Sequence, residues 1–238
     1  FLLYVSHGLV YKEWAGLRMG FASVLILPMI YYLYNGKKIK FFLLALAASL
    51  VQYVGILSFF LFFLNRKFNP KLLLLGLVAS ILIYQYNIGD FIVNFFVQEE
   101  FLPVYIESYL IYENPYVYDA GLTHIKTIQQ LIIVTMLIII FGYNKFETPK
   151  YYHLLFNAYY LGTILIIIFA KHSLIAFRFS GHFSSVEPIL ITYFIVLFKQ
   201  KYSASNIMAL AALFVAYLNY VMFSKVTPYV FLVKNMIN

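Results

Sequence analysis

The chain has 238 residues, of which 63% are hydrophobic and only 11% are charged. Soluble domains are about 45–50% apolar and about 25% charged, so these proportions exclude a water-facing globule and indicate an integral membrane protein. The absence of cysteine excludes disulfides, thiolate metal sites and cysteine nucleophiles. The net charge of +8 is typical of cytoplasmic loops in such a protein and does not indicate nucleic-acid binding.

At about 20 residues per spanning helix, the length accommodates about seven spans. We therefore predict an all-α, polytopic transmembrane helical bundle that forms one transmembrane domain over residues 1–238. The chain begins at Phe1 inside an apolar stretch and shows no signal peptide. From this we expect a fragment that lacks its N-terminal spans.

The first predicted span covers residues 18–34 and contains Pro28, which should kink it. The apolar stretch 41–64 follows, with three cations on each flank. Because cations favour the cytoplasmic side, both flanks should lie there, and a straight span cannot satisfy this. A broken helical hairpin over 41–64, turning near Gln52, resolves the conflict and predicts that Gln52 lines a cavity. A single straight span with one exceptional loop is the alternative.

Five further spans are predicted, at 72–88, 127–143, 151–170, 183–198 and 204–223, with a break at 171–182. An extracytoplasmic loop over 89–125 holds six acids and no Lys or Arg. Within it, residues 99–114 are expected to form a short amphipathic helix on the membrane surface. Ten of the 17 cations then lie in cytoplasmic loops, and seven lie at the outer face: Lys12, Arg18, Lys126, Lys171, Arg178, Lys225 and Lys234.

Two of these outer cations, Arg18 and Arg178, adjoin apolar helices, where an arginine is costly unless it snorkels or pairs. Either one alone could be an interfacial anchor. Two together, with Lys171 nearby, favour a diphosphate site, because guanidinium groups bind phosphate in a bidentate manner. A cationic outer cleft in a polytopic protein therefore suggests a lipid-linked diphosphate as ligand.

The segment 178–188 (RFSGHFSSVEP) is the most distinctive in the chain. His182 could act as a base or orient a hydroxyl, and Glu187 could accept a proton or pair with Arg178. The alternative is a hydrogen-bonded helix cap formed by Ser184 or Ser185.

Other candidates carry a weaker signal. His172, His124 and Asp119 show no metal-ligand spacing, so no metal or cofactor is predicted. The tyrosines of the outer loop could stack on sugars, with Tyr116, Tyr118 and Asp119 as sugar-binding candidates, or form an interfacial aromatic belt. The chain has no P-loop and no GxGxxG, GxSxG or DxD motif, so no residues for cytosolic nucleotide chemistry are evident.

The sequence resembles the EpsG family of bacterial exopolysaccharide biosynthesis proteins, which are Wzy-like polymerases. The segment GLRMGFA at 16–22 is similar to the family's Arg-Gln-Gly-hydrophobic-Ala segment, with Met19 in the glutamine place. The run 42–57 is similar to the family's apolar run with a histidine, whose place Gln52 takes. The segment 178–183 is similar to the Arg-x-x-x-Tyr-Phe box, with His182 in the tyrosine place. A Pro-Tyr at 228–229 adds to the resemblance.

The resemblance implies an inverting sugar transfer at the outer face of the bacterial inner membrane. A hydroxyl of one polyprenyl-diphosphate-linked oligosaccharide would attack the anomeric carbon of another. Arg18, Arg178 and Lys171 would then bind the diphosphate, while Gln52 and His182 orient the acceptor. Partners would be these lipid-linked sugars, membrane lipid and proteins of an export or synthase complex, with no nucleic acid. The alternatives are a ligase and a transporter or flippase for lipid-linked sugars.

Overall fold

The structure, a computed structural model, describes residues 17–98, 119–143 and 150–193. These residues form helices and turns without any strand. The elements are α2 (Leu17–Val24), α3 (Ile26–Tyr34), α4 (Lys38–Val51), the 3-10 helix η2 (Tyr53–Phe59), α5 (Phe60–Phe63), α6 (Pro70–Gln85), α7 (Ile88–Gln98), α9 (Ile125–Tyr143), α10 (Lys150–Ile168), α11 (Ser173–Phe183) and η3 (Ser184–Val186). A helical segment over 187–193 follows η3. The all-α prediction is therefore confirmed for the described chain.

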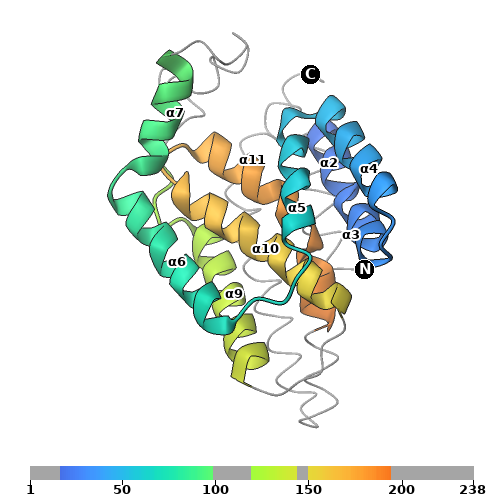
Figure 1. Ribbon diagram of the computed structural model, residues 1–238. Helices are drawn as coiled ribbons and strands as arrows, with labels where there is room; N and C mark the ends of the chain where they lie inside the picture. Colours follow the sequence, from blue (N-terminus) through green and yellow to red (C-terminus); the bar gives the residue numbers. More distant parts are fainter. Residues whose placement is uncertain (1–16, 99–118, 144–149, 194–238) are drawn as a thin grey trace, which may run out of the picture.

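Helix α10 lies at the centre of the described bundle (Figure 1). Its apolar sequence buries Ala158, Tyr159 and Ile166 completely. Helices α6, α7 and α9 lie on one side of α10 and α11, and the segment from α2 to α5 lies on the other. Close contact between α10 and α11 depends on Gly162, where an added Cβ would lie 3.1 Å from the Cβ of Phe183. Small residues at such a crossing are typical of helices packed in a membrane.

Few helices among the described residues are long and apolar enough to cross a membrane. Residues 151–168 of α10 qualify alone, and α6 with the first part of α7 qualifies as a pair bent by 65°. The apolar helices over 18–34, 53–63 and 125–139 are shorter. The prediction of about seven spans is thus not confirmed, because breaks interrupt the apolar stretches and residues 194–238 lie outside the described chain.

The chain reverses its direction within residues 41–64. Helix α4 ends at Val51. The next residue, Gln52, has an extended backbone (φ −149°, ψ 129°), and η2 and α5 return alongside α4. The rings of Phe42 and Phe59 stack with centroids 6.0 Å apart, and the Nζ atom of Lys38 lies 5.6 Å above the Phe62 ring. The predicted hairpin and its turn are confirmed, and the straight-span alternative is wrong.

A glycine lets the two arms of the hairpin meet. Gly55 lies directly against the backbone of Ala48 in α4, so that an added Cβ would overlap the Ala48 carbonyl group. In addition, the Gly55 N–H donates to the carbonyl of Gln52 at 2.7 Å, which tightens the first turn after the break. The close approach of the arms therefore requires a residue without a side chain.

We expect Gly55→Ala to destabilise the protein by about 1–3 kcal/mol, the usual cost of overpacking a tight contact. The added methyl group must separate η2 from α4, because backbone atoms cannot be displaced as a flexible side chain can. Thermal unfolding of the purified protein in detergent measures the change. The control is Gly36→Asn, since nothing lies within 4 Å of its Cβ position and asparagine tolerates its φ of +70°. Equal Tm values for the two variants would contradict the expectation.

Two predicted boundaries are wrong. The expected break at 171–182 is helix α11, because small and polar residues pack on its neighbours, and the chain turns instead just before Ser173. The expected loop 89–125 begins with α7, which leaves α6 after a turn at Asn87 (φ 58°). The surface helix predicted at 99–114 lies outside the described residues.

One end of the bundle is rich in lysine. We define this lysine-rich end by residues 37–40 and 65–71, and the rings of Tyr34 and Tyr151 lie there with centroids 5.9 Å apart. At the opposite end, the Ala120 N–H donates to the carbonyl of Ala170 at 3.0 Å. The hairpin places both predicted cytoplasmic clusters at the first end. That this end faces the cytoplasm remains a prediction from the positive-inside rule.

Candidate functional site

Polar side chains are buried along α11 and the elements that contact it. We call this group the polar seam; it consists of Tyr53, Ser58, Lys126, Gln129, Gln130, Tyr159, Arg178, Ser180, His182 and Glu187. All but Tyr53 and Arg178 are at most 5% exposed. Polar groups inside a membrane bundle are costly and usually face its interior, where they bind substrates or carry protons. The polar seam is therefore the candidate functional site.

On one side, the polar seam joins α11 to the hairpin. Arg178 Nη1 donates to the Tyr53 hydroxyl at 3.0 Å, next to the helix break at Gln52. One turn further along α11, His182 Nε2 is hydrogen-bonded to Ser58 Oγ at 2.7 Å. Residues four apart share a helix face, so both bonds come from the face of α11 that contacts η2. The two bonds hold the break in the hairpin beside the arginine.

On its other side, the polar seam joins α11 and η3 to α9. Ser180 Oγ donates to Gln130 Oε1 at 2.8 Å. Gln129 Nε2 donates to Glu187 Oε1 at 3.1 Å. Two adjacent glutamines of α9 thus bind the two ends of the segment 180–187. These two bonds offset part of the cost of removing the four side chains from water, although Gln129 Oε1 and Gln130 Nε2 find no hydrogen-bond partner among the described residues.

Glu187 is the acidic centre of the polar seam and is only 2% exposed. Lys126, which is 5% exposed, and Tyr159, which is fully buried, both interact electrostatically with it. The Nζ atom of Lys126 also lies 5.3 Å above the ring of Phe177 on α11. A buried carboxyl group and a buried lysine therefore lie within electrostatic range of each other.

Several predicted site residues lie on α2, the hairpin and α11, which are elements that contact one another. Gln52 is half-buried at the break, His182 is fully buried, and Arg178 is half-buried. Arg18 is exposed at the start of α2. Its neighbour Met19 packs on α11, since a Cβ added at Gly181 would lie 3.2 Å from Met19 Cε.

The other predicted residues lie apart from the polar seam. Lys171 is half-buried in the turn before α11. Beside it, His172 is 1% exposed and its Nε2 lies 2.5 Å from Asp90 Oδ1. Asp119 is exposed and accepts the Gly121 N–H at 2.8 Å in a local turn. The sugar-binding candidates Tyr116 and Tyr118 lie outside the described residues.

Ser184 is the C-cap residue of α11, as the capping alternative predicted, although its hydroxyl group does not cap the start of a helix. The hydroxyl groups of both serines donate to carbonyls of the preceding turn, Ser184 to Gly181 at 3.4 Å and Ser185 to His182 at 2.9 Å. Ser185 also donates to the Ser23 carbonyl at 3.1 Å, which ties the segment to α2. Glu187 contacts Gln129 of α9, a partner that the sequence did not indicate.

The sequence did not indicate Tyr53, Ser58, Gln129, Gln130 or Tyr159 as site residues, nor the role of Lys126. One signal was present, because a Gln-Gln pair near the start of a predicted span is costly without partners. Lys126, Gln129 and Gln130 are spaced three and four apart, which places them on one face of α9. Among the described residues, no three His, Asp or Glu side chains gather into a metal site.

Comparison with known proteins gives one clear match. The sequence fits the EpsG family over residues 1–231, nearly its whole length. Neither the curated proteins nor the solved structures give a match. The chain therefore belongs to the EpsG family, whose members are Wzy-like membrane polymerases of exopolysaccharide repeat units.

Proposed function

We propose that this protein polymerises polyprenyl-diphosphate-linked oligosaccharides by inverting glycosyl transfer at the outer face of the bacterial inner membrane. The hydroxyl oxygen of an acceptor repeat unit forms a bond to the anomeric carbon of a donor. The bond from that carbon to the diphosphate breaks, and polyprenyl diphosphate leaves. The acceptor hydroxyl loses its proton. No nucleotide enters the reaction, because the diphosphate already activates the donor.

One observation carries this proposal. Arg178 is half-buried beside a break in a helical hairpin, at the head of a buried polar seam. Irregular backbone at membrane depth persists only where protein or a water-filled cavity surrounds it. A diphosphate leaving group gains negative charge as its bond breaks, so it needs preorganised cations more than a strong acid. A guanidinium group at this place meets that requirement.

We assign the remaining roles from the family resemblance and from the contacts of each residue. Arg18 and Lys171 supplement Arg178 in binding the diphosphate, and Gln52 at the hairpin break orients the acceptor hydroxyl. His182 acts as a positioning residue, because it is fully buried and hydrogen-bonded to Ser58 of η2. Glu187 accepts the proton, and its partners in the polar seam hold the carboxylate in place.

Reconstitution tests the proposal. The full-length protein is placed in proteoliposomes with a polyprenyl-diphosphate-linked oligosaccharide and no nucleotide. We expect a ladder of longer lipid-linked products and release of polyprenyl diphosphate. Movement of the lipid-linked sugar between leaflets without any ladder would instead establish a flippase. Transfer to an acceptor other than a second repeat unit would establish a ligase.

A further inference from the structure

A second polar region lies at the lysine-rich end, across the bundle from Arg178. It is a pocket with a cavity of about 40 Å³ between the segment 65–69, α6, α9 and α10. Its lining consists of Lys67, Phe68, Pro70, Leu73, Leu137, Ile138, Tyr152, His153, Phe156 and Asn157. None of these residues belongs to the polar seam, so the pocket is separate from the proposed polymerisation site.

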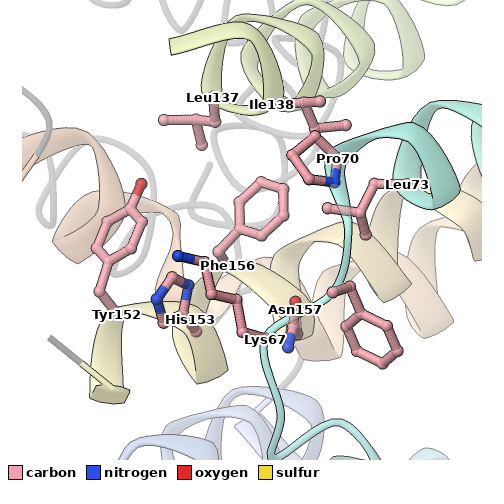
Figure 2. A pocket seen from close by; sticks show the side chains of 10 residues that line it. Lys67, Pro70, Leu73, Leu137, Ile138, Tyr152, His153, Phe156 and Asn157 are labelled. Atoms are coloured by element: carbon pink, nitrogen blue, oxygen red, sulfur yellow. The ribbon is translucent and has the colours of Figure 1, made fainter. Parts of the chain in front are cut away.

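The polar edge of the pocket is basic. Figure 2 shows the side chain of Lys67 extending toward the imidazole of His153. The two side chains lie within electrostatic range of each other. Among the described residues, no Asp or Glu lines the cavity. An anion placed between these two groups would contact the lysine ammonium group and could accept a hydrogen bond from the imidazole.

The position of Lys67 is fixed by the fold. Asn157 Nδ2, on α10, donates to the carbonyls of Leu64 and Arg66, both at 2.7 Å. These two bonds tie the segment that precedes α6 to α10, and Lys67 follows directly. The pocket is thus preformed rather than assembled by a mobile loop, which reduces the entropy cost of binding.

Helix geometry adds to the positive potential. Helix α6 begins at Pro70, one wall of the pocket, and the first turn of α10 contributes Tyr152 and His153. Neither helix has an acidic residue in its first turn. The partial positive charges of two helix N-termini therefore reinforce Lys67 and His153 at one cavity.

Size and lining identify the ligand. The cavity of about 40 Å³ has room for a small polar group such as a phosphate. The wall opposite the basic edge is apolar and includes Leu73, Leu137 and Phe156. We propose that this pocket binds a phosphate ester, supplied by the headgroup of an anionic phospholipid whose acyl chains follow the apolar wall. Basic pockets between helices at the cytoplasmic side recognise lipid headgroups in this manner.

Native mass spectrometry of the full-length protein in detergent, titrated with phosphatidylglycerol, tests the proposal. We expect Lys67→Ala and His153→Gln each to weaken binding of one lipid about tenfold, because each variant removes a hydrogen-bond donor to the phosphate. Lys71→Ala is the matched control, since Lys71 is exposed on the same end but does not line the pocket. This control should bind lipid as the wild type does.

A second arm distinguishes the source of the phosphate. Inorganic phosphate is added in excess over the lipid. If the lipid stays bound, the headgroup is the ligand. If inorganic phosphate displaces the lipid, and does so only when Lys67 is present, the same site binds a soluble phosphate. Lipid and phosphate binding that is equal in the Lys67→Ala and Lys71→Ala variants overturns the proposal.

Discussion

Arg178→Lys should lower the rate of polymerisation by about 10²–10³-fold, the usual effect of removing one donor that stabilises charge in a transition state. Lysine keeps the positive charge, but it cannot donate to the Tyr53 hydroxyl and bind a diphosphate in a bidentate manner at once. The product ladder from proteoliposomes, measured against time, gives the rate. Binding of the lipid-linked donor should change much less, because the diphosphate gains its extra charge only as the bond breaks.

Two variants separate the chemistry of Arg178 from its position. Tyr53→Phe removes the hydroxyl that holds the guanidinium group and should slow polymerisation about tenfold, as expected for one hydrogen bond to a charged group. Arg66→Lys is the matched control, because Arg66 is exposed at the lysine-rich end, over the ring of Phe68. A rate for Arg178→Lys equal to that of Arg66→Lys would show that Arg178 takes no part in the reaction.

The hairpin was predictable because its signal is local. Two cation clusters flank 41–64, and no straight helix can place both on the same side of a membrane. A turn near Gln52 follows from this conflict alone. The sequence did not reveal that Gly55 makes the return possible, since that requires the relative placement of α4 and η2.

Helix α11 was missed for a related reason. Its sequence, SLIAFRFSGHF, mixes polar and apolar residues and resembles a break between spans. In the structure its polar residues meet partners on other elements: Arg178 meets Tyr53, and His182 meets Ser58. These partners are more than 100 residues away in sequence, so no local pattern could indicate them. Tertiary contacts decide whether such a segment is a buried helix or a loop.

The candidate site was found only in part. The motif residues Arg178, His182 and Gln52 were identified, and the structure places them on two adjoining elements. The α9 side of the polar seam was not foreseen. Lys126 in particular was interpreted as a cation at the outer face, whereas the structure buries it and directs it toward α11. Counting the cations on each side of the membrane identifies an unusual cation, but it does not show whether its side chain points into the bundle or out of it.

Lys126 and Glu187 should prove to be energetically coupled. Each is at most 5% exposed, and the two interact electrostatically. Removing one partner of a buried charge pair leaves the other uncompensated, at a cost of about 3–5 kcal/mol. We therefore expect Lys126→Met and Glu187→Gln each to lower the Tm of the protein in detergent strongly. The double variant should unfold at a higher temperature than the sum of the two effects predicts.

A parallel cycle with Lys171→Met gives the control, because Lys171 is half-buried in the turn before α11 and its effect should add to that of Glu187→Gln. Additive effects for Lys126 and Glu187 would show that the polar seam is held by its hydrogen bonds alone. Coupling would mean that the proposed proton acceptor stays ionised inside the bundle because Lys126 faces it. Loss of Lys126 should then reduce polymerisation even where the folded protein persists, since a carboxylate that is already protonated cannot accept the proton of the acceptor hydroxyl.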